Sequence, residues 1–323
     1  MSEGLRPPSR LEPAAAWTVV TDSPLLGLAL AREAGLLLAW DDGGQLYLLD
    51  GHGERRLATR AAGRVLWAAI SDDGSLVAVV SEGPRLWLLD PEFEPLAERP
   101  SISEPSALAV DPHGRYVAVA SRLGITQLYN RFGKQAGRVE TMQPLSHLRF
   151  VPSRPLLLGA SGYGSIVGIE LGTTGSGGTL DPAVAWKQQL LSNVGRLATS
   201  GDGGMVLVSC FTHGVQRYDA RGHNEGSYHL GGTVAHAVPD FAGRLIVVAT
   251  AEGELALLNR AGNVRWKTAL PRPAIALEVD ALGRYFLYGL ATGEITRLDL
   301  EAAPRPATAA PSAAAPTTTP APA

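Results

Sequence analysis

The stretch Asp111-Pro112-His113-Gly114-Arg115-Tyr116-Val117-Ala118-Val119-Ala120 holds the two signals that decide the fold. A short turn with an acidic residue and a Gly leads directly into a run of small and β-branched residues, which is typical of a tight turn before a buried strand. The same turn recurs at intervals of 40, 40, 40, 49, 40 and 40 residues. Its last position is held by Ala34, Gly74, Gly114, Arg154, Gly203, Gly243 and Gly283. The repeat predicts one structural unit for about every forty residues.

A second marker has the same spacing and supports the same units. An acidic or amide residue ends an apolar run in each of them, at Asp50, Asp90, Asn130, Glu170, Asp219, Asn259 and Asp299. Repeats of this length that are built from short strands are typical of β-propellers. We therefore predict an all-β fold with almost no helix: a seven-bladed β-propeller of four-stranded antiparallel blades. The nine extra residues of the 49-residue interval fall near 172–179, where Gly, Ser and Thr predict a flexible surface loop.

Tryptophans indicate how the ring of blades closes. Trp17, Trp186 and Trp266 each stand 17 residues before the turn position of a unit, which places them on the same outer strand. The last unit ends after its third strand, at Leu298-Asp299, so we expect the N-terminal strand around Trp17 to complete the last blade. The predicted domains are an N-terminal extension (1–14), the propeller (15–300) and a tail (301–323). In that tail 20 of 23 residues are Ala, Pro or Thr, which predicts disorder.

Composition narrows the class of partner. The net charge is -3 and no basic run is present, which disfavours nucleic acid and anionic membranes as partners. The N-terminal residues lack the apolar segment of a secretion signal, so we expect a cytoplasmic protein. The lone cysteine, Cys210, lies in a strand-like run and is expected to be a buried thiol.

The repeats resemble those of the WD40 and quinoprotein-like propeller superfamily over residues 15–300. The run 111–120 resembles the second strand of a WD40 repeat, and 252–266 is similar to a quinoprotein-type repeat, in which a Gly precedes a Trp by four residues. The Trp-Asp dipeptide of WD40 repeats is replaced by endings such as Leu89-Asp90. The resemblance implies the propeller fold and no particular function.

One set of polar residues stands out when the predicted inner strands are aligned. His147, Arg196 and His236 share a position that holds Gly, Ala or Trp in the other four units, and Arg149 lies two residues further on. We expect these side chains to gather near one rim of the central channel, with Tyr163 and His213 from neighbouring loops. The residues predicted to bind a ligand or partner are His147, Arg149, Tyr163, Arg196, His213 and His236. The alternative is that they are solvated channel residues that bond to water or to Glu278.

Two functions remain open at this point. We find none of the sequence motifs of hydrolases, metal sites or phosphate loops, and predict no catalytic residue, metal ligand or cofactor. The first hypothesis is a noncatalytic interaction scaffold that binds a protein partner through one face. The second is a small-ligand-binding or metal-dependent enzyme propeller that uses the His/Arg cluster, where three histidines could bind zinc. Arginine favours an anionic peptide or small anion, and histidines that charge below pH 6.5 predict stronger binding towards pH 6.

Overall fold

The computed structural model describes residues 12–61, 63–174 and 179–300. This part of the chain forms 27 strands and no helix, which confirms the predicted all-β class. Residues 1–11 of the predicted N-terminal extension and the predicted tail, 301–323, lie outside the described residues.

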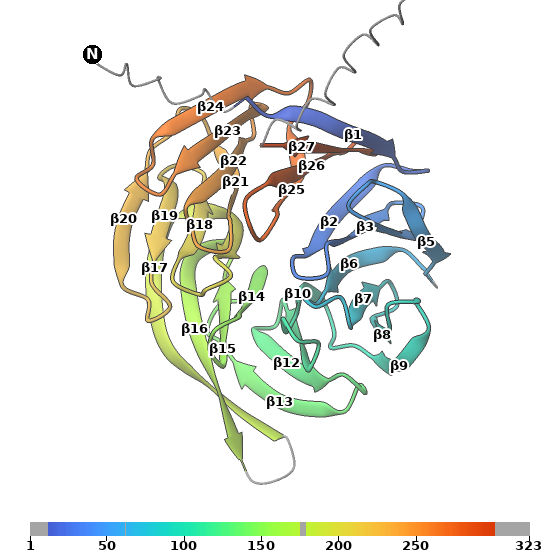
Figure 1. The fold of residues 1–323 in the computed structure, drawn as a ribbon. Helices are drawn as coiled ribbons and strands as arrows, with labels where there is room; N and C mark the ends of the chain where they lie inside the picture. The colour runs from blue at the N-terminus through green and yellow to red at the C-terminus, as the bar shows by residue number, and fades with distance from the viewer. Residues whose placement is uncertain (1–11, 62, 175–178, 301–323) are drawn as a thin grey trace, which may run out of the picture.

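The strands form six antiparallel sheets, which are arranged around a common centre (Figure 1). The first sheet contains β2 (Leu25–Ala31), β3 (Leu36–Asp41), β4 (Gln45–Leu49) and β5 (Arg55–Arg60). The second contains β6 (Val65–Ile70), β7 (Val77–Ser81), β8 (Arg85–Leu89) and β9 (Pro95–Pro100). The third contains β10 (Pro105–Val110), β11 (Tyr116–Ser121), β12 (Ile125–Asn130) and β13 (Gln135–Glu140).

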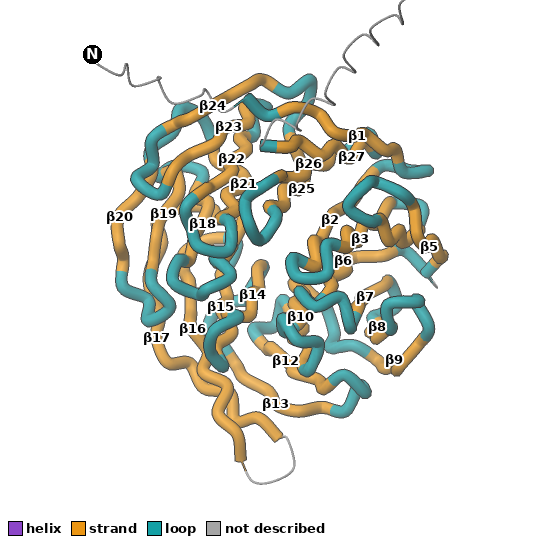
Figure 2. Tube along the Cα trace, in the orientation of Figure 1, coloured by secondary structure: helices purple, strands orange, loops and turns teal. Residues whose placement is uncertain are grey.

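The fourth sheet has seven strands, β14 (His147–Val151), β15 (Leu156–Ala160), β16 (Tyr163–Thr174), β17 (Thr179–Thr199), β18 (Val206–Cys210), β19 (Gly214–Tyr218) and β20 (Asn224–Tyr228). The last two sheets contain β21 (Val234–Pro239), β22 (Leu245–Thr250), β23 (Glu254–Asn259) and β24 (Val264–Ala269); and β25 (Ala274–Val279), β26 (Tyr285–Leu290), β27 (Glu294–Asp299) and β1 (Ala14–Val20). Short loops join most of these strands (Figure 2).

The second strands of the sheets are buried on both faces, which explains their unbroken apolar sequences. All five residues of β7 are buried, as are all five of β15 and of β18. The turn before such a strand is held by its acidic residue: the backbone amide of Arg244 donates to Asp240 Oδ1 over 2.7 Å. Gly243 follows with a φ of 62°, a conformation that glycine adopts without strain. The turn residues that repeat in the sequence therefore set where each buried strand begins.

The core lies between neighbouring sheets. One cluster joins Leu86 and Val80 of the second sheet to Val117 and Val119 of the third, and all four are fully buried. The first strands of the sheets, together with the end of β17, face the centre of the ring and contact one another in succession (Figure 1). β25 in turn contacts β2, so this inner ring has no open end.

The seven-stranded sheet exists because one long strand takes part in two pairings. Residues 179–193 of β17 pair with β16, and residues 194–199 of the same strand pair with β18. The inserted segment 172–179 was predicted to be a loop, and this prediction is wrong for residues 172–174 and 179, which lie in strands. Thr174 pairs with Thr179, so β16 and β17 extend as a hairpin that projects from the ring (Figure 1). Threonine favours strands, and only residues 175–178 of the insertion are left undescribed.

The extended hairpin packs on the sheet before it. Leu171 and Leu180 share a buried cluster with Leu128 and Val139 of the third sheet. A side chain at Gly137 of β13 would lie 3.0 Å from Pro182, so the glycine permits this close contact. The insertion therefore adds apolar contact between two sheets.

The two ends of the described chain meet in the last sheet. β1 pairs with β27 in the antiparallel sense, with Ala14 opposite Asp299 and Val20 opposite Glu294. This is the pairing that the position of Trp17 predicted. Trp17 and Val19 also pack against the buried cluster that joins the first and last sheets.

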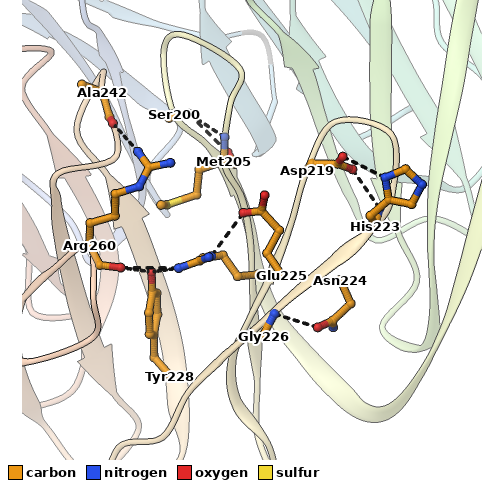
Figure 3. Close-up of polar contacts among 11 residues, drawn as sticks. Ser200, Met205, Asp219, His223, Asn224, Glu225, Gly226, Tyr228, Ala242 and Arg260 are labelled. Carbon is orange, nitrogen blue, oxygen red and sulfur yellow. Dashed lines mark hydrogen bonds and ion pairs between the residues drawn. The ribbon is translucent and has the colours of Figure 1, made fainter.

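Aromatic side chains on outer strands bind a turn of the next repeat unit. The indole nitrogen of Trp17 donates to the carbonyl of Gly51 over 3.1 Å, and that of Trp186 donates to Ala220 over 3.2 Å. The hydroxyl of Tyr228 makes the equivalent bond to the carbonyl of Arg260 over 2.6 Å (Figure 3). Each acceptor directly follows the acidic or amide residue that ends a unit, so we call this contact the outer clamp.

Candidate functional site

The polar residues singled out in the sequence follow a backbone irregularity at the start of the inner strands. The register shifts between Val194 and Arg196 in β17, and between Val234 and His236 in β21. The same shift occurs near the start of β2, β6, β10 and β25. A β-bulge changes the direction of the side chains that follow it. The repeated bulge therefore places the residue at this position in the same way in six units, whereas β14, which begins at His147, pairs with β15 without a register shift.

Arg196 is neutralised by a carboxylate from another sheet. Its Nη2 lies 2.6 Å from Glu278 Oε1, and the two side chains are 19% and 4% exposed. Glu278 belongs to β25, so this ion pair connects the seven-stranded sheet with the last sheet. The sequence analysis left open a bond to Glu278, and for Arg196 the structure shows it.

A second ion pair, not identified from the sequence, lies at the other end of the inner strands. The guanidinium of Arg32 makes a two-pronged contact with Asp72, with Nε–Oδ1 at 3.1 Å and Nη2–Oδ2 at 2.7 Å. Its Nη1 also donates to the carbonyl of Thr199 in β17, over 3.3 Å. Arg32 comes from the turn after β2, so it reaches from the first sheet to the seven-stranded sheet. Both side chains are nearly buried.

Arg32 was overlooked because it lies in a degenerate turn. A signal was present, since Asp72 stands 40 residues later and therefore holds the same repeat position in the next unit. Burial lowers the pKa of Arg32, but the hydrogen bonds that Arg32 donates to Asp72 outweigh it, so that the pKa is raised. The pKa of Asp72 is lowered in turn, because Arg32 outweighs the burial of the carboxylate. Both groups are therefore charged near neutral pH.

The charges of both ion pairs act on Arg149, which belongs to neither pair. Its side chain is half-buried, and no described carboxylate or carbonyl pairs with its guanidinium. Burial is the main cause that lowers its pKa, and Arg32 and Arg196 act in the same direction. Asp72 and Glu278 raise the pKa of Arg149, so the charges of both ion pairs influence this residue. An arginine stays protonated in proteins even so.

The two histidines contact the backbone of the next inner strand. His147 Nε2 lies 3.2 Å from the carbonyl of Val194, and His236 bonds to the backbone of Ala274. Val194 and Ala274 hold the same repeat position, so the two contacts are equivalent. The Nδ1 atom of His236 is buried and has no partner among the described residues. We call Arg32, Asp72, His147, Arg149, Arg196, His236 and Glu278 together the central cluster.

These histidines do not carry the charge that the sequence analysis expected near pH 6. Burial is the main cause that lowers the pKa of His147, and nearby Arg196 lowers it further. Burial and Arg196 together lower the pKa of His236 to about 3. Both pKa values lie below the 6.5 on which the prediction of stronger anion binding towards pH 6 rests, so the structure gives that prediction no support. The arginines alone supply the positive charge of the central cluster.

The loop residues of the predicted site lie on the surface. Tyr163 is 58% exposed at the start of β16, where it pairs with Asn193. His213 is exposed, bonds to Thr212 through Nδ1 over 2.8 Å, and borders a surface hollow of about 240 Å³. Cys210 borders the same hollow, and burial raises the pKa of its thiol to about 11. The polar contacts of the described chain do not link Tyr163 or His213 to the central cluster.

The described residues provide no ready metal site. No group of three His, Cys, Asp or Glu side chains in them is arranged to hold a metal ion. The three-histidine zinc site of the alternative hypothesis therefore finds no support in residues 12–61, 63–174 and 179–300.

The described part of the chain has no helix that is long and apolar enough to cross a membrane.

No protein-family model matches the chain, and no curated protein matches its sequence. The resemblance to WD40 and quinoprotein-like repeats therefore remains a prediction from the residues alone.

Proposed function

We propose that the chain is a seven-bladed β-propeller. The seven-stranded sheet is then two four-stranded blades that share β17, whose first part is the outer strand of one blade and whose last part is the inner strand of the next. The unbroken contacts of the inner strands and the pairing of β1 with β27 support this interpretation. In it, β1 is the outer strand of the last blade and leaves β27 without a free edge.

We propose further that this propeller is a noncatalytic scaffold that binds a protein partner through one face. The observation that carries this proposal is a group of exposed apolar side chains on the face where the inner strands begin. They are Leu123, Met142, Tyr163, Leu191 and Phe211, with exposures from 39% for Phe211 to 94% for Met142. We call these five residues the loop face.

The order of the strands explains why the five lie on the same side. In an antiparallel sheet the loop between the second and third strands lies at the end where the first strand starts. Leu123, Tyr163 and Phe211 come from such loops or strand ends. Met142 and Leu191 come from the segments that lead into the next inner strand. All five therefore belong to the end at which His147, Arg196 and His236 also lie.

Hydrogen bonds connect these loops with neighbouring segments at the same end of the sheets. The amide of Thr141, next to Met142, donates to the carbonyl of Gly124 over 2.8 Å. Gln143, on the other side of Met142, accepts a bond from Ser165 Oγ over 2.6 Å. Two further bonds lie where the inner part of β17 begins. The amide of Val194 donates to the carbonyl of Gly162, and the amide of Phe211 donates to the carbonyl of Asn193, both over 3.0 Å.

Large exposed apolar side chains on one face favour a protein interface. Large exposed apolar side chains that cluster on a folded domain mark interaction sites more often than scattered ones do. Aromatic residues such as Tyr163 and Phe211 are enriched where partners bind. Because the hydrogen-bonded loops are held by the sheets, the surface is rigid before binding and loses little entropy there.

The test is affinity capture from cells with quantitative mass spectrometry. The wild-type chain is compared with Tyr163→Ser/Leu191→Ser and with the control Phe132→Ser/Leu282→Ser. Phe132 and Leu282 are 64% and 62% exposed but lie in turns at the other end of the sheets. We expect a protein that is captured by the wild type and the control and lost with the loop-face variant. Equal capture by all three would contradict the proposal.

A purified partner then allows the effect to be measured. Loss of two central apolar side chains from a protein interface should weaken binding by at least about 2 kcal/mol, or roughly thirtyfold. Both variants should keep the unfolding transition of the wild type, because surface substitutions change stability by about 0.5 kcal/mol or less.

A further inference from the structure

The charges of the central cluster do not balance. It contains three arginines but only two carboxylates, and each carboxylate is paired with a different arginine. The pairs are Arg32 with Asp72 and Arg196 with Glu278. Arg149 is left over, with no described carboxylate as partner. Since the histidines are neutral at neutral pH, the cluster carries one positive charge in excess.

The fold does not require an arginine at this position. The corresponding residues of five other units are uncharged, and that of the last unit is Glu278; the uncharged residues are Ala29, Ala69, Ala109, Ala198 and Val238. A half-buried guanidinium without a partner is unfavourable, because it loses water without gaining a counter-charge. Two neighbouring arginines add repulsion at Arg149. A negatively charged ligand would remove both penalties.

We infer that Arg149 is the centre of a binding site for a small oxyanion of the carboxylate, sulfate or phosphate type. The guanidinium offers donors in a planar fork that matches the oxygens of such anions. Arg196 is partly exposed and its charge acts on Arg149, so its remaining donors can contribute. Arg32 is nearly buried and has its donors engaged by Asp72 and Thr199, so it acts only through its charge. This inference is independent of the apolar loop face.

The first experiment measures thermal stability of the isolated protein against anion concentration. Sodium sulfate, phosphate and acetate are titrated at constant ionic strength with sodium chloride as the balance. Arg149→Met is compared with the control Arg265→Ala, which removes one charge from an exposed residue of β24. Sulfate and phosphate stabilise proteins in general. The control variant measures this general effect, because it keeps Arg149. We expect a saturable rise in Tm for the wild type and control that Arg149→Met loses.

A second variant changes the affinity in the opposite direction. Glu278→Gln removes the carboxylate that neutralises Arg196, so the cluster gains a further positive charge. The half-saturating anion concentration should then fall by about tenfold, from the added attraction at short range. The same anion dependence in the wild type, Arg149→Met and Glu278→Gln would overturn the inference. Free anions are the only ligands in these measurements, so a failure here leaves the proposal of a protein partner untouched.

An acidic peptide is the second arm of the test. A short Glu-rich peptide at the same carboxylate concentration should raise Tm no more than acetate if the site takes a small free anion. A much larger shift with the peptide, lost in Arg149→Met, would show that the ligand is an acidic chain and would overturn the assignment to a small anion.

Discussion

His236 shows how a single buried residue links stability to pH. Burial and Arg196 hold its pKa at about 3, whereas in the unfolded chain a histidine titrates near 6.5. Between these two values the unfolded state binds a proton that the folded state does not bind. Stability is therefore fully present above about pH 6.5 and decreases as the pH falls towards 3. His147 acts in the same direction.

We predict that His236→Gln makes stability less dependent on pH. The wild-type histidine should contribute a slope of up to about 1.4 kcal/mol per pH unit below pH 6.5. Urea unfolding at pH 7, 6 and 5 measures this slope, and His52→Gln, at an exposed histidine, is the control. Identical slopes for His236→Gln and the control would show that His236 charges as easily in the folded protein as in the unfolded one.

Residue positions in the repeat were predictable, whereas their partners were not. The alignment of units identified Arg149 and Arg196 as unusual because no other unit holds an arginine at either position. It could not show that Arg196 reaches Glu278 of the last sheet, since that contact depends on the path of side chains across the ring. Arg32 was hidden for a related reason: its turn holds Ala34 at the repeat position where most other turns hold Gly.

At the scale of elements, the outer clamp is a contact that joins one repeat unit to the next. Trp186 of β17 packs on the turn that contains Gly222, where a side chain would come within 2.6 Å of the indole ring. Its indole nitrogen also bonds to the carbonyl of Ala220. The glycine, with a φ of 83°, serves both the turn and this close contact. The clamp therefore depends on two residues that lie 36 positions apart.

We predict that smaller side chains at Trp186 lower the stability of the protein in steps. Trp186→Phe keeps most of the ring but removes the indole hydrogen bond, and should lower the free energy of unfolding by about 1 kcal/mol or somewhat more. Trp186→Ala also removes the packing and should lower it by about 3 to 5 kcal/mol. Val184→Ala, at a 44% exposed residue of the same strand, is the control and should change it by less than about 0.5 kcal/mol. Chemical denaturation distinguishes these values, and equal effects of Trp186→Ala and Val184→Ala would contradict the role of the clamp.

The strands were predictable from the sequence because their signals are local. Each turn and each apolar run, such as 111–120, predicts a turn and a strand that the structure contains. The hairpin extension at 172–174 and 179–182 was not predictable, because Gly and Thr are common in both loops and strands. Its pairing depends on contacts of Leu180 and Pro182 with the neighbouring sheet, which no local pattern contains.

At the scale of the whole molecule, β1 determines whether the ring of sheets is held together at its ends. It pairs with β27 over its whole length, and Trp17 adds the outer clamp to Gly51 of the first sheet. Without β1, β27 would expose its unpaired amide and carbonyl groups. An exposed strand edge of this kind promotes association between molecules.

We predict that removal of residues 1–20 lowers Tm and leads to association that depends on protein concentration. Removal of residues 1–11 alone is the control, because it leaves β1 intact. Thermal unfolding and size-exclusion chromatography measure the two effects. If both truncated chains match the full-length chain, the pairing of β1 with β27 contributes nothing to the stability of the molecule.

The pairing of Ala14 with Asp299 also means that the same arrangement of strands can be reached from a different starting point in the chain. The start of the first described strand and the end of the last lie side by side, so a short peptide could join them into a closed loop. New termini could then be opened at the tip of the projecting hairpin, between Thr174 and Thr179, where the chain crosses from one strand to the next. Such a circular permutant would keep every strand neighbour while beginning in the middle of the present sequence.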